Sequence, residues 1–91
     1  MLKNNFRALE RIVRGFSNHR RIEILELLSK TPELSLLEVA DMLEINYKTA
    51  SEHVRRLAIA GLLIKRNEAN TVRHKLTTRG KSILVFLRTL E

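Results

Sequence analysis

The sequence predicts a single, mainly α-helical domain of about five helices with a small two-stranded β-hairpin. Three observations lead to this prediction. A chain of 91 residues has the length of one small domain. Apolar residues recur with the 3.6-residue period of a helix through residues 2–61 and again after residue 77. In residues 62–76 the period changes to two, which is typical of strands.

The first helix is predicted over residues 2–16. Its apolar side chains follow one another at intervals of four and three residues: Leu2, Phe6, Leu9, Val13 and Phe16. This spacing is that of a coiled-coil seam. Gly15 and Ser17 are expected to end the helix, and the side chain of Asn18 is expected to cap the next one.

Two further helices are predicted before residue 45. The helix over residues 19–30 is apolar on more than half of its circumference, so we expect it at the centre of the core. Its apolar residues are Ile22, Ile24, Leu25, Leu27 and Leu28. Thr31 precedes Pro32 and ends this helix. Ser35 and Glu38 form a capping box that starts a short third helix, with Leu36, Val39, Ala40 and Leu43 facing inward.

The fourth helix is predicted within residues 46–61, with Asn46 as its N-cap and Gly61 at its end. Ala50, Val54 and Leu57 share one side, which should be buried. The opposite side carries Lys48, Glu52, Arg55 and Ile59, flanked by Ser51 and Arg56. A short capped helix, a tight turn and a helix with a polar, basic face make a helix-turn-helix, whose second helix reads DNA. A solvated surface helix is the alternative.

After residue 61 the pattern predicts a β-hairpin, with strands at residues 62–66 and 71–76 and a turn at residues 67–70. Val72, His74 and Leu76 share one face of the second strand, and Arg73 and Lys75 share the other. A hairpin directly after the fourth helix is a wing, here residues 62–77. Thr77 or Thr78 is expected to cap a last helix over residues 78–90, with an apolar stripe of Ile83, Leu84, Leu87 and Leu90.

The net charge of +7 is concentrated in one part of the chain. Residues 1–44 hold seven Lys and Arg against seven Asp and Glu, and residues 82–91 hold one of each sign. Residues 45–81 hold nine basic residues against two acidic ones, which accounts for the whole excess. A polyanion is the expected partner, because cations that contact its phosphates release counterions.

The composition argues against several other kinds of protein. The chain has no cysteine, which excludes disulfides and thiolate metal sites. His19, His53 and His74 are too scattered for a recognisable metal site and are interpreted as capping, packing or surface residues. Neither a catalytic triad, a carboxylate pair nor a glycine-rich phosphate loop is present, so we expect no enzymatic activity. No apolar run reaches the length of a membrane span or signal peptide, which favours a cytoplasmic, nucleoid-associated protein.

Three segments resemble the ArsR-type winged helix-turn-helix regulators. Residues 16–25 (FSNHRRIEIL) resemble their opening signature, and residues 43–54 (LEINYKTASEHV) resemble their recognition helix. Residues 60–62 (AGL) and 76–80 (LTTRG) resemble the frame of the wing, which MarR-type regulators share. The resemblance spans roughly residues 6–88. It implies a homodimeric transcription regulator, usually a repressor, that binds double-stranded DNA sequence-specifically.

The resemblance also implies which residues contact DNA. Those of the fourth helix would enter the major groove: Tyr47, Lys48, Thr49, Ser51, Glu52 and Arg55. Arg56 flanks them, and Arg66 and Arg73 would lie on the wing. Lys48, Ser51 and Arg55 are candidates for phosphate or base contacts. Tyr47 either contacts DNA or packs against the preceding turn. Glu52 either accepts from a cytosine amino group or pairs with Arg56.

Two arginine assignments have structural alternatives. Arg66 and Arg73 would enter a minor groove or grip its phosphates, or would simply be charged residues of an edge strand. Arg21 would touch a phosphate from the start of its helix, or would pair with Glu26 or another acid.

The metal-sensing function of some ArsR-type regulators does not carry over to this chain. Such members have a Cys-x-Cys pair at positions that correspond here to Ser35 and Leu37. Others use acidic and histidine ligands on the last helix, where this chain has no histidine and only Glu91. We therefore expect no metal and no cofactor.

The terminal helices are the expected dimer interface. In the family's dimers, Leu2, Phe6, Leu9 and Val13 would pack on Ile83, Leu87 and Leu90 of a second copy. Packing of the same helices within one chain is the alternative. Two other functions also stay open: an architectural protein that coats DNA without sequence preference, and a winged helix that binds other proteins in a larger assembly.

Overall fold

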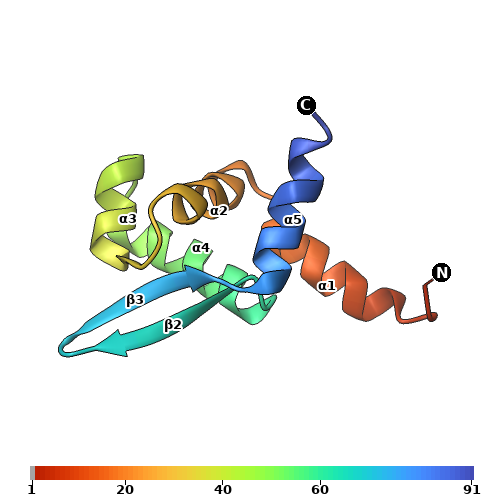
Figure 1. Ribbon diagram of the computed structural model, residues 1–91, viewed down its shortest axis with the longest axis horizontal. Helices are drawn as coiled ribbons and strands as arrows, with labels where there is room; N and C mark the ends of the chain where they lie inside the picture. Colours follow the sequence, from red (N-terminus) through yellow and green to blue (C-terminus); the bar gives the residue numbers. More distant parts are fainter. Residues whose placement is uncertain (1) are drawn as a thin grey trace.

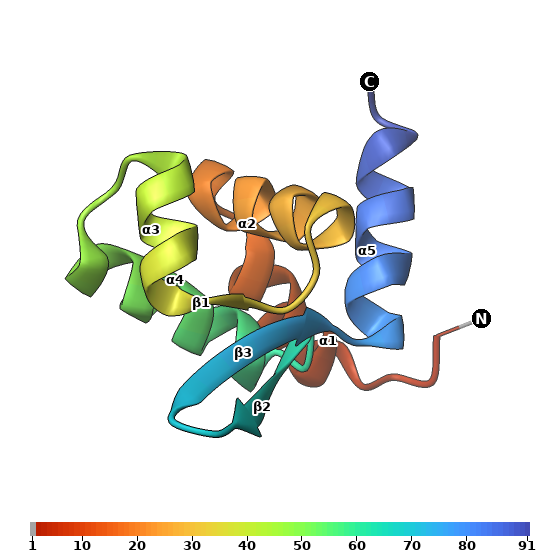
Figure 2. The ribbon, with the colours of Figure 1, turned by 60° about the vertical axis from the view of Figure 1, so that its left-hand side comes forward.

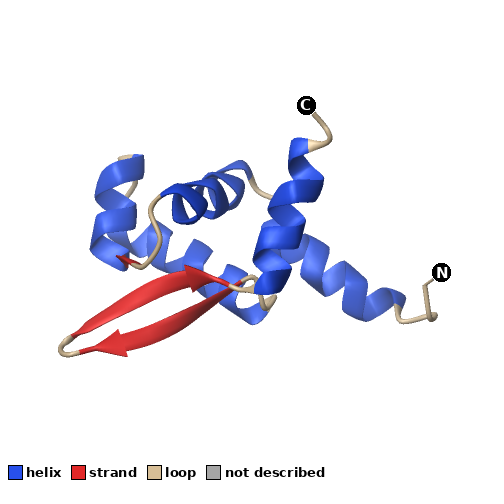
Figure 3. Ribbon diagram, viewed as in Figure 1, coloured by secondary structure: helices blue, strands red, loops and turns tan. Residues whose placement is uncertain are grey.

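Residues 2–91 are described by a computed structural model, which places five α-helices and a three-stranded antiparallel sheet in this part of the chain (Figures 1 and 3). The elements follow the order α1, α2, β1, α3, α4, β2, β3, α5. The molecule is elongated, with extents of 43 × 28 × 21 Å. The tip of the hairpin and the N-terminus lie toward opposite ends of its long axis in Figure 1. The predicted fold class, mainly helical with a wing, is confirmed.

Helix α1 (Phe6–Phe16) begins at residue 6, so the prediction of a helix from residue 2 is wrong. The backbone of Asn4 is left-handed, with φ 61°, a conformation that asparagine tolerates but that interrupts a right-handed helix. Gly15 does not end the helix either. It is buried within α1, and a Cβ atom at this position would lie 2.4 Å from Cβ of Ala60. Gly15 therefore lets α1 approach the end of α4 (Tyr47–Ile59) closely.

Helix α2 (His19–Lys30) has the predicted bounds. The side chain of Asn18 caps it by accepting from the backbone N–H groups of Arg20 and Arg21, at 2.9 and 3.2 Å. Helix α3 (Leu36–Leu43) starts at the predicted capping box, in which Ser35 and Glu38 bond each other's backbone N–H groups. These caps confirm the two helix starts.

The sheet contains a strand that the sequence pattern did not predict. Strand β1 (Leu34–Ser35) pairs antiparallel with β3 (Thr71–Leu76), and β3 pairs with β2 (Leu63–Glu68), in the order β1-β3-β2. The hairpin turn is also shorter than predicted, because Asn67 and Glu68 belong to β2 and pair with Val72 and Thr71. Only residues 69 and 70 form the turn, and Ala69 takes a left-handed φ of 55° to close it.

Helix α5 (Thr78–Arg88) starts as predicted, since the hydroxyl of Thr77 accepts from the N–H of Gly80 at 3.0 Å. It ends at Arg88, so Leu90 lies beyond the helix.

The core joins α2, α3 and α4 to the base of the hairpin (Figure 2). Its fully buried large side chains are Ile24, Leu25, Leu28, Val39, Val54, Leu57, Leu62 and Leu63. Ala50, Val54 and Leu57 are buried as the helical pattern of α4 predicts. The opposite side of α4 is consequently left facing solvent. Among the helices of residues 2–91, none combines the length and apolar character needed to cross a bilayer.

Candidate nucleic-acid interface

Both ends of α4 are fixed by hydrogen bonds. At its start, Oδ1 of Asn46 accepts from the N–H groups of Lys48 and Thr49, at 2.8 and 3.3 Å. At its end, Gly61 takes a left-handed φ of 76°, and its N–H donates to the carbonyl of Ala58. The next N–H, of Leu62, reaches back to Leu57 O, which completes a Schellman motif. Helix α4 is thus capped at both ends and lies within the predicted residues 46–61.

The residues predicted to contact DNA lie together on the outward side of α4. Tyr47, Lys48, Thr49, Glu52, Arg55 and Arg56 are exposed, and Ser51 is half-buried. Tyr47 is 55% exposed, which leaves much of its side chain open to a partner; its two interpretations both stay predictions. Ile59 is 70% exposed at the other end of the same face. Cations, hydroxyls and an aromatic ring are therefore exposed to a partner that binds along this side of the helix.

One carboxylate partly neutralises this face. Glu52 accepts from Nε and NH2 of Arg55, at 3.1 and 2.8 Å, and from Nε of Arg56 at 3.0 Å. The hydrogen bonds from Arg55 and then from Arg56 lower the pKa of Glu52 to about 2, so this carboxylate is charged at neutral pH. Pairing of Glu52 with Arg56 was one of its two predicted roles. Both arginines are therefore held near the helix surface in the free protein.

Arg21 contacts α4 on the side that faces the rest of the protein, a role that the sequence did not indicate. Its Nε donates to Nδ1 of His53 at 3.2 Å, and its NH1 donates to the carbonyl of Arg14 at 3.0 Å. The predicted pairing of Arg21 with Glu26 is wrong, because Glu26 pairs with Lys30 and Arg88 instead. Burial first, and then the guanidinium of Arg21, lower the pKa of His53. One side chain thus connects α1 and α2 to α4.

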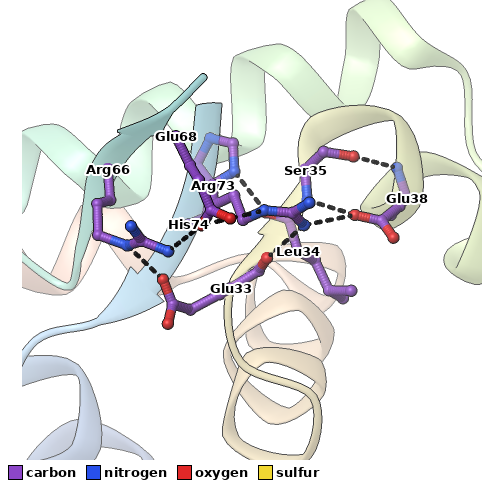
Figure 4. Close-up of polar contacts among 8 residues, drawn as sticks. All are labelled: Glu33, Leu34, Ser35, Glu38, Arg66, Glu68, Arg73 and His74. Atoms are coloured by element: carbon purple, nitrogen blue, oxygen red, sulfur yellow. Dashed lines mark hydrogen bonds and ion pairs between the residues drawn. The ribbon is translucent and has the colours of Figure 1, made fainter. Parts of the chain in front are cut away.

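Arg66 and Arg73 lie opposite each other on the wing and are neutralised by carboxylates (Figure 4). Arg66 donates to Glu33 and to Glu68, both at 2.5 Å. Arg73 donates to the carbonyl of Glu33 at 3.1 Å and to the carboxylate of Glu38 at 3.4 Å. The hydrogen bond from Arg66 lowers the pKa of Glu68. In the free protein these two arginines hold the wing against β1 and the start of α3.

The wing offers other cations that the predicted site omitted. Lys65 is exposed and lies opposite His74 in the β2–β3 ladder, and Lys75 is exposed opposite Ile64. Lys65 also lines a groove between the wing and the start of α4, together with Tyr47 and Val72. Strand alternation did not indicate Lys65 as an exposed cation, because Lys65 lies on the same face of the hairpin as the buried His74.

His74 is buried and serves the sheet. Its Nδ1 donates to the carbonyl of Leu34 at 2.9 Å, which fastens β1 to the wing. Burial of the ring lowers the pKa of His74. Within residues 2–91, no three His, Cys, Asp or Glu side chains come together in a way that could hold a metal ion.

The terminal segments present an apolar surface. Leu2, Phe6, Leu9 and Val13 are 63%, 61%, 37% and 50% exposed, and Leu90 is 66% exposed. Ile83 and Leu87, which were predicted to face a second copy, are half-buried against their own core. Phe86, which was not predicted, is 52% exposed on α5. The candidate dimer surface therefore includes Phe86, and Ile83 and Leu87 belong to it only in part.

Comparisons with known proteins agree with this geometry. A family model described as winged helix-turn-helix DNA-binding matches residues 17–64. The transcriptional activator HlyU of Vibrio cholerae is 34% identical over 91 residues, covering 99% of this chain and 82% of HlyU. A solved structure of HlyU from Vibrio cholerae superimposes with a TM-score of 0.82 at 31% identity, covering 98% of this chain and 97% of that one.

Two further relatives are similar over most of the chain. The cadmium resistance transcriptional regulatory protein CadC homolog of Staphylococcus aureus is 30% identical over 76 residues, which cover 84% of this chain and 63% of the relative. The solution structure of Mb0332 from Mycobacterium bovis has a TM-score of 0.85 at 20% identity, covering 99% of this chain and 87% of that one. That domain is described as homodimeric and as a possible ArsR-family regulator; at this identity the likeness concerns the fold.

Proposed function

Because the chain belongs to the winged helix-turn-helix DNA-binding family, as an ArsR-like transcriptional regulator, we propose that it binds double-stranded DNA sequence-specifically as a homodimer. Helix α4 enters the major groove, and the wing lies on the adjacent groove or backbone. The observation that carries this proposal is the outward face of α4. Its cations and hydroxyls are exposed on a helix that is capped at both ends.

The contacts divide into those that read bases and those that position the protein. Lys48 and Arg55 reach far enough to donate to guanine edges, and Ser51 serves bases or backbone. Tyr47, Thr49 and Arg56 lie beside these residues and are suited to contact phosphates. On the wing, Lys65 and Lys75 are free for phosphates, whereas Arg66 and Arg73 reach DNA only by leaving their carboxylate partners.

Glu52 favours sequence-specific binding over an architectural role. A protein that coats DNA without preference gains from every uncompensated cation. Here a carboxylate stands in the middle of the recognition face and binds two of its arginines. The carboxylate repels phosphates and accepts a hydrogen bond from a cytosine amino group, so it favours particular sequences.

The apolar surface of the terminal segments supports the homodimer. Phe6, Leu9 and Val13 fall on one side of α1, and a second copy would cover them. Two recognition helices would then enter successive major grooves about 34 Å apart, on a near-palindromic site. Such a dimer on a promoter blocks polymerase by occupancy, so we propose repression. We also propose that the protein resides on the nucleoid and works without metal or cofactor.

Selection from random duplexes at about physiological salt tests this function. The expected result is a recovered palindrome. Enrichment without a motif would support the architectural alternative, and no enrichment would support a protein-binding module. A reporter gene placed behind the recovered site then separates repression, in which expression falls when the protein is present, from activation.

A further inference from the structure

The N-terminal helix α1 carries a second cationic surface. The zero net charge of residues 1–44 as a whole does not reveal it. Residues 1–44 have no net charge, but residues 1–16 hold four basic residues and one acid, a net of +3. Residues 17–44 hold three basic residues and six acids, a net of −3. The positive half folds into α1, and the negative half forms α2, β1 and α3. The charge is therefore separated in space between different elements.

Three arginines form one stripe on α1. At 100° per residue, Arg7, Arg11 and Arg14 fall within about 60° of one another. The stripe points about 130° away from the apolar side formed by Phe6, Leu9 and Val13. A dimer built through the apolar side therefore leaves the arginine stripe in solvent.

The stripe continues onto the recognition helix. Gly15 brings α1 against the end of α4, where a Cβ atom would be 2.4 Å from that of Ala60. Arg11, Arg14 and Arg56 then line one groove, with Ile59 and Ala60 between them. Arg56 itself belongs to the outward face of α4, so the two cationic surfaces meet at this groove.

Two arginines of the stripe are free to bind an anion. Arg14 pairs with Glu10 at 2.9 Å, and Arg56 pairs with Glu52 at 3.0 Å. For Arg7 and Arg11, no carboxylate in the described part of the chain lies within ion-pairing distance, and both are exposed. Exposed, unpaired guanidiniums beside a DNA-reading helix fit phosphate oxygens, which they bind bidentately.

We propose that Arg7 and Arg11 of α1 contact backbone phosphates of the bound duplex, on the side of α4 away from the wing tip. This inference rests on the proposed DNA binding, and it enlarges the protein surface that contacts DNA. In Figure 1, α1 and the wing leave α4 toward opposite ends of the long axis. The protein then contacts the duplex on both sides of the recognition helix, through the wing on one side and through α1 on the other. These contacts add affinity without sequence preference.

Titration of full-length variants with the selected duplex and with a random duplex of equal length, at several salt concentrations, tests this surface. The test variant is Arg7→Gln with Arg11→Gln. The matched control is Lys30→Gln with Lys81→Gln, which removes the same charge from other surfaces. Each phosphate-binding cation that is removed lowers the slope of log affinity against log salt by about 0.9 and weakens binding about fivefold at ~0.15 M salt, so the double variant should lower the slope by about 1.8 and weaken binding about 25-fold for each bound protomer. We expect this weakening equally on both duplexes, and less than a twofold effect for the control.

The remaining outcomes are distinguishable. If wild type binds but the α1 variant matches the control, the α1 contact is wrong and the proposed function stands. If wild type binds neither duplex, the proposed function fails and the inference fails with it. Arg7→Lys with Arg11→Lys retains the charge and should keep the wild-type salt slope. Sedimentation of all variants must give the wild-type oligomeric state; a change confined to assembly, with an unchanged salt slope, would also overturn the inference.

Discussion

Arg21 donates from Nε to Nδ1 of His53, 3.2 Å away, and so connects the first turn of α2 to the middle of α4. The same side chain also donates to the carbonyl of Arg14 near the end of α1. The guanidinium of Arg21 therefore connects three helices, on the side of α4 that faces the rest of the protein.

Replacing Arg21 by Ala should destabilise the fold, because the half-buried ring of His53 and the more exposed carbonyl of Arg14 would both lose a charged donor. We expect a decrease of about 1–2 kcal/mol in the free energy of unfolding, measured by urea denaturation. Arg20→Ala is the control, since the side chain of Arg20 makes only a local ion pair with Glu23, three residues on in the same helix, and its removal should cost less than about 1 kcal/mol. Equal effects for the two variants would mean that the His53 and Arg14 contacts contribute nothing.

The stability of the protein should fall when the pH drops from 7.5 to 5.5. The pKa values of His53 and His74 are both below their ordinary 6.5 in the folded state, chiefly through burial. The unfolded chain therefore binds more protons over this range, and unfolding becomes easier as the pH falls below about 6.5. The lowered carboxylate pKa values act only at more acidic pH, below their ordinary 4.5.

Thermal unfolding at fixed ionic strength measures this dependence. In the double variant His53→Gln with His74→Gln the decrease in stability between pH 7.5 and 5.5 should be smaller than in wild type, whatever the variant's absolute stability. An unchanged decrease would place the titrating groups elsewhere.

Arg55→Ala and Lys48→Ala should weaken binding to the selected duplex roughly tenfold to a hundredfold if these side chains donate to base edges. The informative measurement is the ratio of affinities for the selected and random duplexes. That ratio should fall if the replaced residue contacts base edges. If both duplexes lose affinity alike, the residue is a phosphate anchor.

Glu52→Gln should tighten binding to random DNA by several-fold, because it releases two arginines and removes a charge that repels phosphates. Binding to the selected duplex should gain less, so specificity declines. Glu44→Gln is the control, since it removes one negative charge from an exposed residue outside α4. If both variants gain the same affinity for random DNA, Glu52 acts only through its contribution to the net charge of the protein.

Val13→Asp should dissociate the dimer. The side chain is 50% exposed in the single chain, so a charge there is tolerated by the monomer but not at an apolar interface. Sedimentation should show the shift to monomer, and binding to a palindrome should weaken while binding to a half-site persists. Val85→Asp, which is 59% exposed on a different side of α5 from Ile83 and Phe86, is the control and should stay dimeric.

The parts of the fold that sequence analysis predicted correctly are set by neighbouring residues. Asn18, Ser35, Asn46 and Thr77 each bond backbone N–H groups two or three residues away, so the cap and the helix it starts are visible in one short window. The burial of Ala50 and Val54 follows from helical periodicity in the same way.

The features that it missed depend on residues distant in the sequence. Strand β1 has only two residues and exists because His74, forty positions later, pairs with Leu34. Glu33 accepts from Arg66 across thirty-three positions, so no local pattern could indicate that this wing arginine is already paired. The start of α1 depends on the backbone of Asn4, which no periodicity reports.

The contact between Gly15 and Ala60 links α1 directly to α4, without any flexible side chain between them. In a dimer that meets through α1, the distance from the two-fold axis to each α4 is therefore set by two small residues. We expect this contact to influence the spacer length of the operator that the proposed dimer prefers. A methyl group added at residue 15 would displace α1 from α4, and the dimer would then select half-sites with a different separation while each half-site kept its sequence.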